Sequence, residues 1–148
     1  MSKSGSIPLA VTHEVRDTCL CLHTQRAARS MARRFDEALA PSRLTNGQFS
    51  LLVSLNRPEP PPLGAVAALL AMDRTTLTAN LKPLERRRLV KVAVDRNDRR
   101  SHLLVLTPAG KALLKKALPI WRKTHGEVDR AFSRPQLDQL RAGLAAIS

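Results

Sequence analysis

The stretch that decides the fold runs from residue 73 to residue 110 and reads DRTTLTANLKPLERRRLVKVAVDRNDRRSHLLVLTPAG. Its first part has the pattern of a basic helix. Two short apolar segments follow, separated by a polar tip, and the start of another helix closes the stretch. A helix followed by a hairpin is able to contact two grooves of one DNA duplex. The order of these parts predicts a winged helix-turn-helix.

The basic helix is predicted over residues 74–88, with Asp73 as the N-cap that accepts from backbone N–H groups of the first turn. Leucines at 77, 81 and 84 recur near helical spacing and predict a buried stripe. Pro83 removes one backbone hydrogen bond and is expected to bend the helix. The opposite face carries hydroxyls, an amide and cations, the groups that contact base edges and phosphates. These candidate DNA-reading residues are Arg74, Thr75, Thr76, Thr78, Asn80, Lys82 and Arg86.

The hairpin is predicted from the alternation of Val90, Val92 and Val94 with other residues, and from Leu104 and Leu106 after the tip. Acids alternate with arginines between these segments, which favours a loop in which Asp95 or Asp98 holds one arginine by a bidentate pair. The remaining arginines are then free to enter a minor groove. The candidate wing residues are Arg96, Asn97, Asp98, Arg99 and Arg100. Thr107 and Pro108 have the pattern of an N-cap followed by proline at the first helical position.

Composition favours the same class of partner. The formal net charge is +13, the isoelectric point is about 11.4, and residues 74–100 hold nine Lys and Arg against three acids. Such a basic element indicates a polyanion, here double-stranded DNA. Aromatic content is 3% with no Tyr, which argues against an RNA-binding sheet. The chain has no Gly-rich phosphate loop, paired-carboxylate cluster or nucleophile elbow, so we do not expect an enzyme.

At 148 residues we expect one domain with helical extensions, mainly α with a small β-hairpin wing. The expected parts are a flexible N-terminus over 1–11, helical segments over 12–40 and 108–148, and a DNA-binding lobe over 41–107. No transmembrane run or secretory segment is apparent, so a cytoplasmic location without a membrane partner is expected. Single helices are predicted over 12–39, 46–56, 63–70 and 108–132, with a kink at Pro119, and from Ser133 onward.

These residues resemble the multiple-antibiotic-resistance-regulator (MarR) family of bacterial transcription factors. The resemblance covers the chain from about residue 15 and is most specific in three segments: Met72 to Thr78, Leu84-Glu85 with Leu89-Val90, and Asp95 to Gly110. It implies a homodimer formed by the first helix and the last two, so that residues 12–40 and 108–148 are the dimerisation region. It further implies a reading helix in the major groove, a wing in the minor groove, a two-fold operator, and repression that a signal relieves.

Two departures from the family pattern carry expectations of their own. Arg88 stands where relatives commonly have Gly, and a left-handed backbone there costs on the order of 1 kcal/mol for Arg. Residues 58–62 are unusually rich in proline for a strand. We therefore expect two strands in the wing sheet rather than a regular three.

The residues leave open which signal relieves repression. Cys19 and Cys21 suggest a redox sensor, although residues two apart on a helix do not face each other. Among the cysteines and the four histidines, only Cys19 and His23, four residues apart, have the spacing of metal ligands. Two ligands alone do not define a metal site, so no metal or cofactor is expected. The resemblance places Trp121 near a site where relatives bind small phenolic acids. The candidate pocket residues are His23, Phe49 and Trp121, with Arg26 as a carboxylate anchor.

Together with this resemblance, the sequence predicts a sequence-specific DNA-binding transcriptional regulator, a ligand-responsive repressor that acts as a homodimer on a pseudo-palindromic operator. A small aromatic or phenolic effector is the expected ligand. Two alternatives remain open: a redox-responsive regulator that uses Cys19 and Cys21, and a basic architectural protein that binds nucleic acid through phosphates alone.

Overall fold

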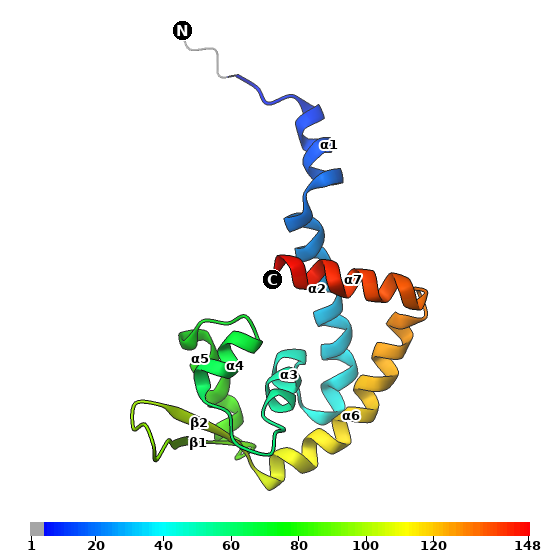
Figure 1. The fold of residues 1–148 in the computed structure, drawn as a ribbon. Helices are drawn as coiled ribbons and strands as arrows, with labels where there is room; N and C mark the ends of the chain where they lie inside the picture. The colour runs from blue at the N-terminus through cyan, green and yellow to red at the C-terminus, as the bar shows by residue number, and fades with distance from the viewer. Residues whose placement is uncertain (1–4) are drawn as a thin grey trace. The chain divides into compact units, whose positions relative to one another are not determined.

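The computed structural model describes residues 5–148 as seven α-helices, one 3-10 helix and one β-hairpin (Figure 1). In chain order the elements are α1 Leu9–Thr18, α2 Leu20–Leu39, η1 Ala40–Ser42, α3 Asn46–Ser54, α4 Leu63–Leu69, α5 Arg74–Arg86, β1 Val90–Val94, β2 His102–Leu106, α6 Pro108–Asp129 and α7 Arg134–Ile147. The chain divides into two compact units, one ending at Arg34 and one beginning at Phe35. The fold class predicted from the sequence is confirmed.

The N-terminal unit differs from the predicted single helix over residues 12–39. Helix α1 begins at Leu9, inside the stretch expected to be flexible, and a break at Cys19 separates it from α2. Cys19 is extended, with φ −73° and ψ 106°, and the Thr18 hydroxyl donates to the Glu14 carbonyl at 2.8 Å. Asp, Thr and Cys in succession are weak helix formers that offer the backbone alternative partners. The flexible segment was also predicted over residues 1–4, which lie outside the described residues.

The core of the second unit lies where the leucine periodicity placed it. Leu77, Leu81 and Leu84 of α5 are buried, as predicted. They are joined by buried side chains from the surrounding elements, among them Leu39, Leu52, Val66, Leu104 and Ala117. Each fully buried leucine contributes about 1.5–3 kcal/mol relative to exposure. The stripe therefore fixes which face of α5 is turned outward.

The helix boundaries in this unit follow capping residues. Thr45 and Ser133 each form a capping box with a glutamine three residues on, and Thr107 accepts from the Gly110 N–H. Helix α6 ends at Asp129, three residues before the predicted end, and α3 ends two residues early at Ser54. Pro119 lies inside α6, which bends along its course (Figure 1). Pro83 lies inside α5, which continues to Arg86.

The sheet is an antiparallel pair in which Val90 faces Leu106 and Val94 faces His102. A third strand is reduced to one bridge between Pro62 and Leu103, with the Leu104 N–H donating to the Pro61 carbonyl at 2.9 Å. Prolines have no N–H to donate, so this segment supplies only acceptors. The expectation of two strands is confirmed for this physical reason. The hairpin packs beside α4 and α5.

Candidate nucleic-acid interface

Helix α5 presents one polar face to solvent because its apolar stripe is buried. The Asp73 side chain accepts from the Thr76 N–H at 2.7 Å and so caps the helix at the predicted position. That backbone hydrogen bond, followed by one from the Thr76 hydroxyl, lowers the pKa of the Asp73 carboxyl. All the candidate reading residues are exposed, namely Arg74, Thr75, Thr76, Thr78, Asn80, Lys82 and Arg86.

Their side chains differ in how free they are. The Thr76 hydroxyl donates to Asp73 Oδ2 at 2.9 Å, and the Thr78 hydroxyl donates to the Arg74 carbonyl at 2.8 Å. Both hydroxyls therefore keep lone pairs to accept from a base but have their proton engaged. Asn80 Nδ2 lies 3.7 Å from the Met72 sulfur, a weak contact. Within residues 5–148 the Thr75 hydroxyl makes no hydrogen bond, so it is free to donate and accept.

Arginine 87 has a structural contact that the sequence did not reveal. Its Nη1 donates to the Arg43 carbonyl at 2.6 Å and ties the end of α5 to the residue that follows η1. Arg43 itself has φ 55°, in the left-handed region. Nothing in the spacing of residues 43 and 87 could have paired them, since the contact joins segments 44 positions apart.

The wing tip is held by turns and not by the predicted ion pair. Asp95 Oδ1 accepts from the Asn97 N–H at 2.9 Å, and Asp98 Oδ1 accepts from the Arg100 N–H at 3.0 Å. No carboxylate of residues 5–148 lies within 4.0 Å of a wing arginine. The prediction of a bidentate Asp–Arg pair is therefore wrong, because a short Asp side chain reaches the backbone N–H two residues on more readily than a distant guanidinium. All three wing arginines remain exposed and unpaired within the described chain.

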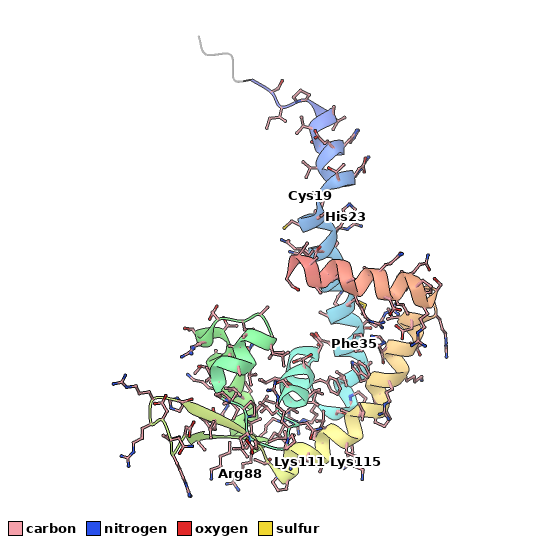
Figure 2. All side chains as sticks on the ribbon, viewed as in Figure 1. Cys19, His23, Phe35, Arg88, Lys111 and Lys115 are labelled. Carbon is pink, nitrogen blue, oxygen red and sulfur yellow. The ribbon has the colours of Figure 1, made fainter. Side chains whose placement is uncertain are left out.

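The base of the hairpin is locked to α6 around the carbonyl of Leu89. The Thr107 hydroxyl donates to the Arg88 carbonyl at 2.7 Å, and the Thr107 N–H donates to that of Leu89 at 3.1 Å. A Cβ placed on Gly110 would overlap the Leu89 carbonyl oxygen and come within 2.7 Å of Leu106 Cδ1. Figure 2 shows Arg88 and Lys111 at this junction. Only glycine fits at position 110, which explains its place in the motif.

Arginine 88 adopts the left-handed backbone expected for its position, with φ 56°. Its N–H donates to the Glu85 carbonyl and the Leu89 N–H to the Leu84 carbonyl, so the end of α5 turns directly into β1. The side chain is exposed. Helix α5 therefore ends with the hydrogen bonds expected for a left-handed residue at this position, although Arg and not Gly adopts that conformation.

A groove of about 470 Å³ separates the start of α4 and α5 from the wing. Two arginines, one aspartate and one histidine supply its titratable groups: Arg74, Arg100, Asp98 and His102. Nitrogen-tipped side chains extend outward from the hairpin tip (Figure 2). Reading helix and wing thus present cations on both sides of one hollow.

The candidate effector residues fall into two sets. Phe49 and Trp121 stack at 6.1 Å between ring centroids, with planes 15° apart, and His125 lies 4.9 Å from Trp121. His125, whose Nδ1 is 3.2 Å from Asp129 Oδ2, was not predicted, although its i, i+4 spacing from Trp121 was a signal. His23 and Arg26 belong to the other unit, where they line a depression of about 580 Å³ on α2 with Ala27, Arg29, Ser30 and Arg33.

Both cysteines are free thiols. Cys19 lies in the break between α1 and α2, where its sulfur is 3.4 Å from the Leu22 N–H, and Cys21 is exposed, its sulfur 3.2 Å from Gln25 Nε2. Figure 2 labels Cys19 and His23, the spacing considered for a metal. In the part of the chain that the structure describes, no three His, Cys, Asp or Glu side chains gather as metal ligands. In the same part, no helix is long and apolar enough to cross a bilayer.

A short helix, a second helix with an exposed polar face and a two-stranded wing define a winged helix-turn-helix protein. The sequence model of the MarR family matches residues 44–102. The HTH-type transcriptional regulator TtmR of Methylorubrum extorquens is 34% identical over 100 residues, which cover 68% of this chain and 51% of TtmR. The chain thus spans about half the length of that curated relative.

Solved structures match over nearly their whole length. The Mycobacterium tuberculosis transcriptional regulator MosR, in complex with DNA, is 39% identical with a TM-score of 0.75, covering 86% of this chain and 96% of MosR. The repressor CouR bound to a 23-mer DNA duplex is 28% identical with a TM-score of 0.80, covering 97% and 99%. CouR of Rhodococcus jostii has also been solved with p-coumaroyl-CoA, at 25% identity and a TM-score of 0.78, covering 88% and 92%.

The chain belongs to the MarR family. The relatives named above are transcriptional regulators, so membership favours a DNA-binding regulator over an enzyme, as the sequence predicted.

Proposed function

We propose that the chain is a sequence-specific DNA-binding transcriptional regulator of the bacterial cytoplasm. The observation that carries this proposal is the polar face of α5, fully exposed beside a wing whose arginines make no ion pair within the described residues. Hydroxyls and an amide read base edges, while cations bind phosphates and a minor groove. MosR and CouR, both solved on DNA, support the same use of this fold.

The protein acts as a homodimer on a pseudo-palindromic operator. Helices α1 and α7 have no buried residue in the single chain, yet both carry large apolar side chains. Leu140, Leu144 and Ile147 of α7 are 47%, 45% and 58% exposed. A second copy covers such faces and sets two reading helices about 34 Å apart, one turn of DNA. Domain limits of 12–40 and 108–148 for dimerisation belong to this proposal.

The regulator is a repressor that a small aromatic effector releases from DNA. The stacked Phe49 and Trp121 offer an aromatic surface, and the relative CouR has been solved bound to p-coumaroyl-CoA. An effector acts by preferring the dimer geometry that does not fit the operator.

A redox signal through Cys19 is the second candidate, because the Cys19 thiol lies at the break between α1 and α2. Mild peroxide would then abolish DNA binding in the wild type and not in Cys19→Ser.

The first test compares binding to a duplex of the gene's own upstream intergenic DNA with binding to a random duplex, across a salt series. A regulator prefers the upstream duplex at physiological salt and gives a two-fold footprint. A protein that binds through phosphates alone shows equal affinity for both, and the two affinities decline together as salt rises. Equal binding would overturn the proposal in favour of an architectural protein.

Point variants sharpen this test. Thr75→Ala and Asn80→Ala remove base-reading groups and should each weaken operator binding by about 1–3 kcal/mol without changing random-duplex binding. Thr75 is a better choice than Thr76, because Thr76 also bonds the Asp73 cap. Lys82→Ala is the matched control on the same face. It should weaken both duplexes alike and reduce the salt slope by about 0.9.

A further inference from the structure

Gly64, in the first turn of α4, is the starting point for an inference that rests on the proposed function. A Cβ at this position would lie 2.9 Å from Arg74 Nη2 and 3.6 Å from Arg74 Cζ. The guanidinium of the first residue of α5 therefore lies against the backbone of α4, in space that any side chain at 64 would occupy. Of the glycines at 5, 47, 64, 110, 126 and 143, only this one has a side-chain cation as its nearest neighbour.

The guanidinium held there faces the groove between the helices and the wing. Gly64, Arg74, Arg100 and His102 all line that groove. Within residues 5–148 no carboxylate lies within 4.0 Å of Arg74, so its charge is not neutralised by the protein. Asp98 is the one acid of the groove, and its Oδ1 already accepts from the Arg100 N–H. The net charge of these groups is positive, and the hollow is polar and open.

We infer that this groove binds a phosphate of the DNA backbone between the reading helix and the wing, and that Gly64 is the positioning residue that keeps Arg74 in it. A planar guanidinium donates two parallel hydrogen bonds to phosphate oxygens when its orientation is fixed. Arg100 supplies the second cation from the wing side. A phosphate bound to both fixes the spacing of helix and wing on the duplex and carries no base information itself. Arg74 thus acts on the backbone and not on a base edge.

Replacing Gly64 by Ala tests the positioning role with a minimal change. The nearest atoms are the far end of a flexible side chain, so the guanidinium moves aside while the fold is kept. Alanine is also the better helix former. We expect Gly64→Ala to weaken operator binding about tenfold at physiological salt, as for one lost charge-assisted hydrogen bond, and to lower the salt slope by about 0.9. Random-duplex binding should weaken by the same factor.

Two further variants give the matched comparison. Gly47→Ala adds the same methyl inside α3, where a Cβ meets nothing within 4 Å, and should leave binding unchanged. In an Arg74→Ala background Gly64→Ala should have no further effect, because the group it displaces is absent. If Gly64→Ala still weakens binding there, or if it binds like the wild type, the positioning role is overturned.

A loss of fold would be visible as a lower thermal midpoint. In that case the phosphate site is tested without Gly64→Ala, by the salt dependence of DNA binding of Arg74→Ala and Arg100→Ala. Each of these variants should lower the salt slope by about 0.9, and an unchanged slope for Arg74→Ala rejects the phosphate site. Failure of the inference is distinct from failure of the proposed function. A wild-type protein that does not prefer its upstream duplex contradicts the function, whereas selective wild-type binding with a normal Gly64→Ala variant contradicts only the groove.

Discussion

The two ends of the hairpin are built in opposite ways. At its base, Leu104 and Leu106 are buried, Thr107 donates to the Arg88 and Leu89 carbonyls, and Gly110 leaves room for the Leu89 carbonyl against α6. At its tip, every residue from 96 to 100 is exposed, and two aspartates hold the loop only through backbone N–H groups. The base has no space for a larger side chain, whereas the arginines at the tip are exposed to solvent. Substitutions at the base should therefore change stability, and those at the tip should change DNA binding.

The largest expected effect is at the base. Gly110→Ala would force the added methyl into the Leu89 carbonyl, so the hairpin and α6 must separate. Overpacking of this kind costs about 3 kcal/mol of unfolding free energy. Urea denaturation followed by circular dichroism measures the loss, with Gly126→Ala as the control that should not lower stability. A Gly110→Ala protein as stable as the wild type would contradict the view that substitutions at the base of the hairpin lower stability.

The next effect is at the tip. Arg96→Ala and Arg100→Ala should each weaken operator binding about tenfold, since each removes a charge-assisted contact of about 1.5 kcal/mol. The thermal midpoint should stay unchanged, because neither side chain makes an ion pair in the described chain. Fluorescence anisotropy on the operator gives the affinities. Lys123→Ala, an exposed cation of α6, is the matched control and should bind normally.

A smaller effect of the opposite sign is expected at Arg88, where α5 turns into β1 at the base of the hairpin. Arg88 has φ 56°, and glycine accepts this left-handed backbone without the cost that other residues carry. Arg88→Gly should raise the unfolding free energy by about 1 kcal/mol, seen as a higher urea midpoint at constant slope. Any accompanying loss of DNA affinity would show that the exposed side chain contacts phosphate. A lower midpoint would mean that the side chain itself stabilises the junction.

The smallest effect separates two ways of bracing the tip. Asp98 accepts from a backbone N–H, and an asparagine oxygen does the same. Asp98→Asn should therefore bind the operator like the wild type, while Asp98→Ala should bind about threefold more weakly, in line with a net hydrogen bond of about 0.5–1.5 kcal/mol. An ion pair with an arginine predicts instead that Asn fails as badly as Ala. Affinity measurements on both variants decide between these bracing schemes.

Local signals predicted most of this fold correctly because their physics is local. The caps at Asp73, Thr107 and Ser133 each act within one turn, and the stripe of Leu77, Leu81 and Leu84 follows from helical spacing alone. The strands and their polar tip were likewise correct. The errors lie where a local preference competed with another, as at Cys19, where one long apolar pattern concealed a break.

The sequence by itself determined the class of fold, the outward face of α5 and the basic character of helix and wing, since periodicity and charge are written residue by residue. Only the tertiary structure decided that Gly110 seats the Leu89 carbonyl, that Gly64 leaves space for the Arg74 guanidinium, and that Arg87 reaches Arg43. These contacts join segments from 10 to 44 positions apart. The residues next to a glycine in the sequence do not reveal which group occupies the space beside it, because that group comes from another element.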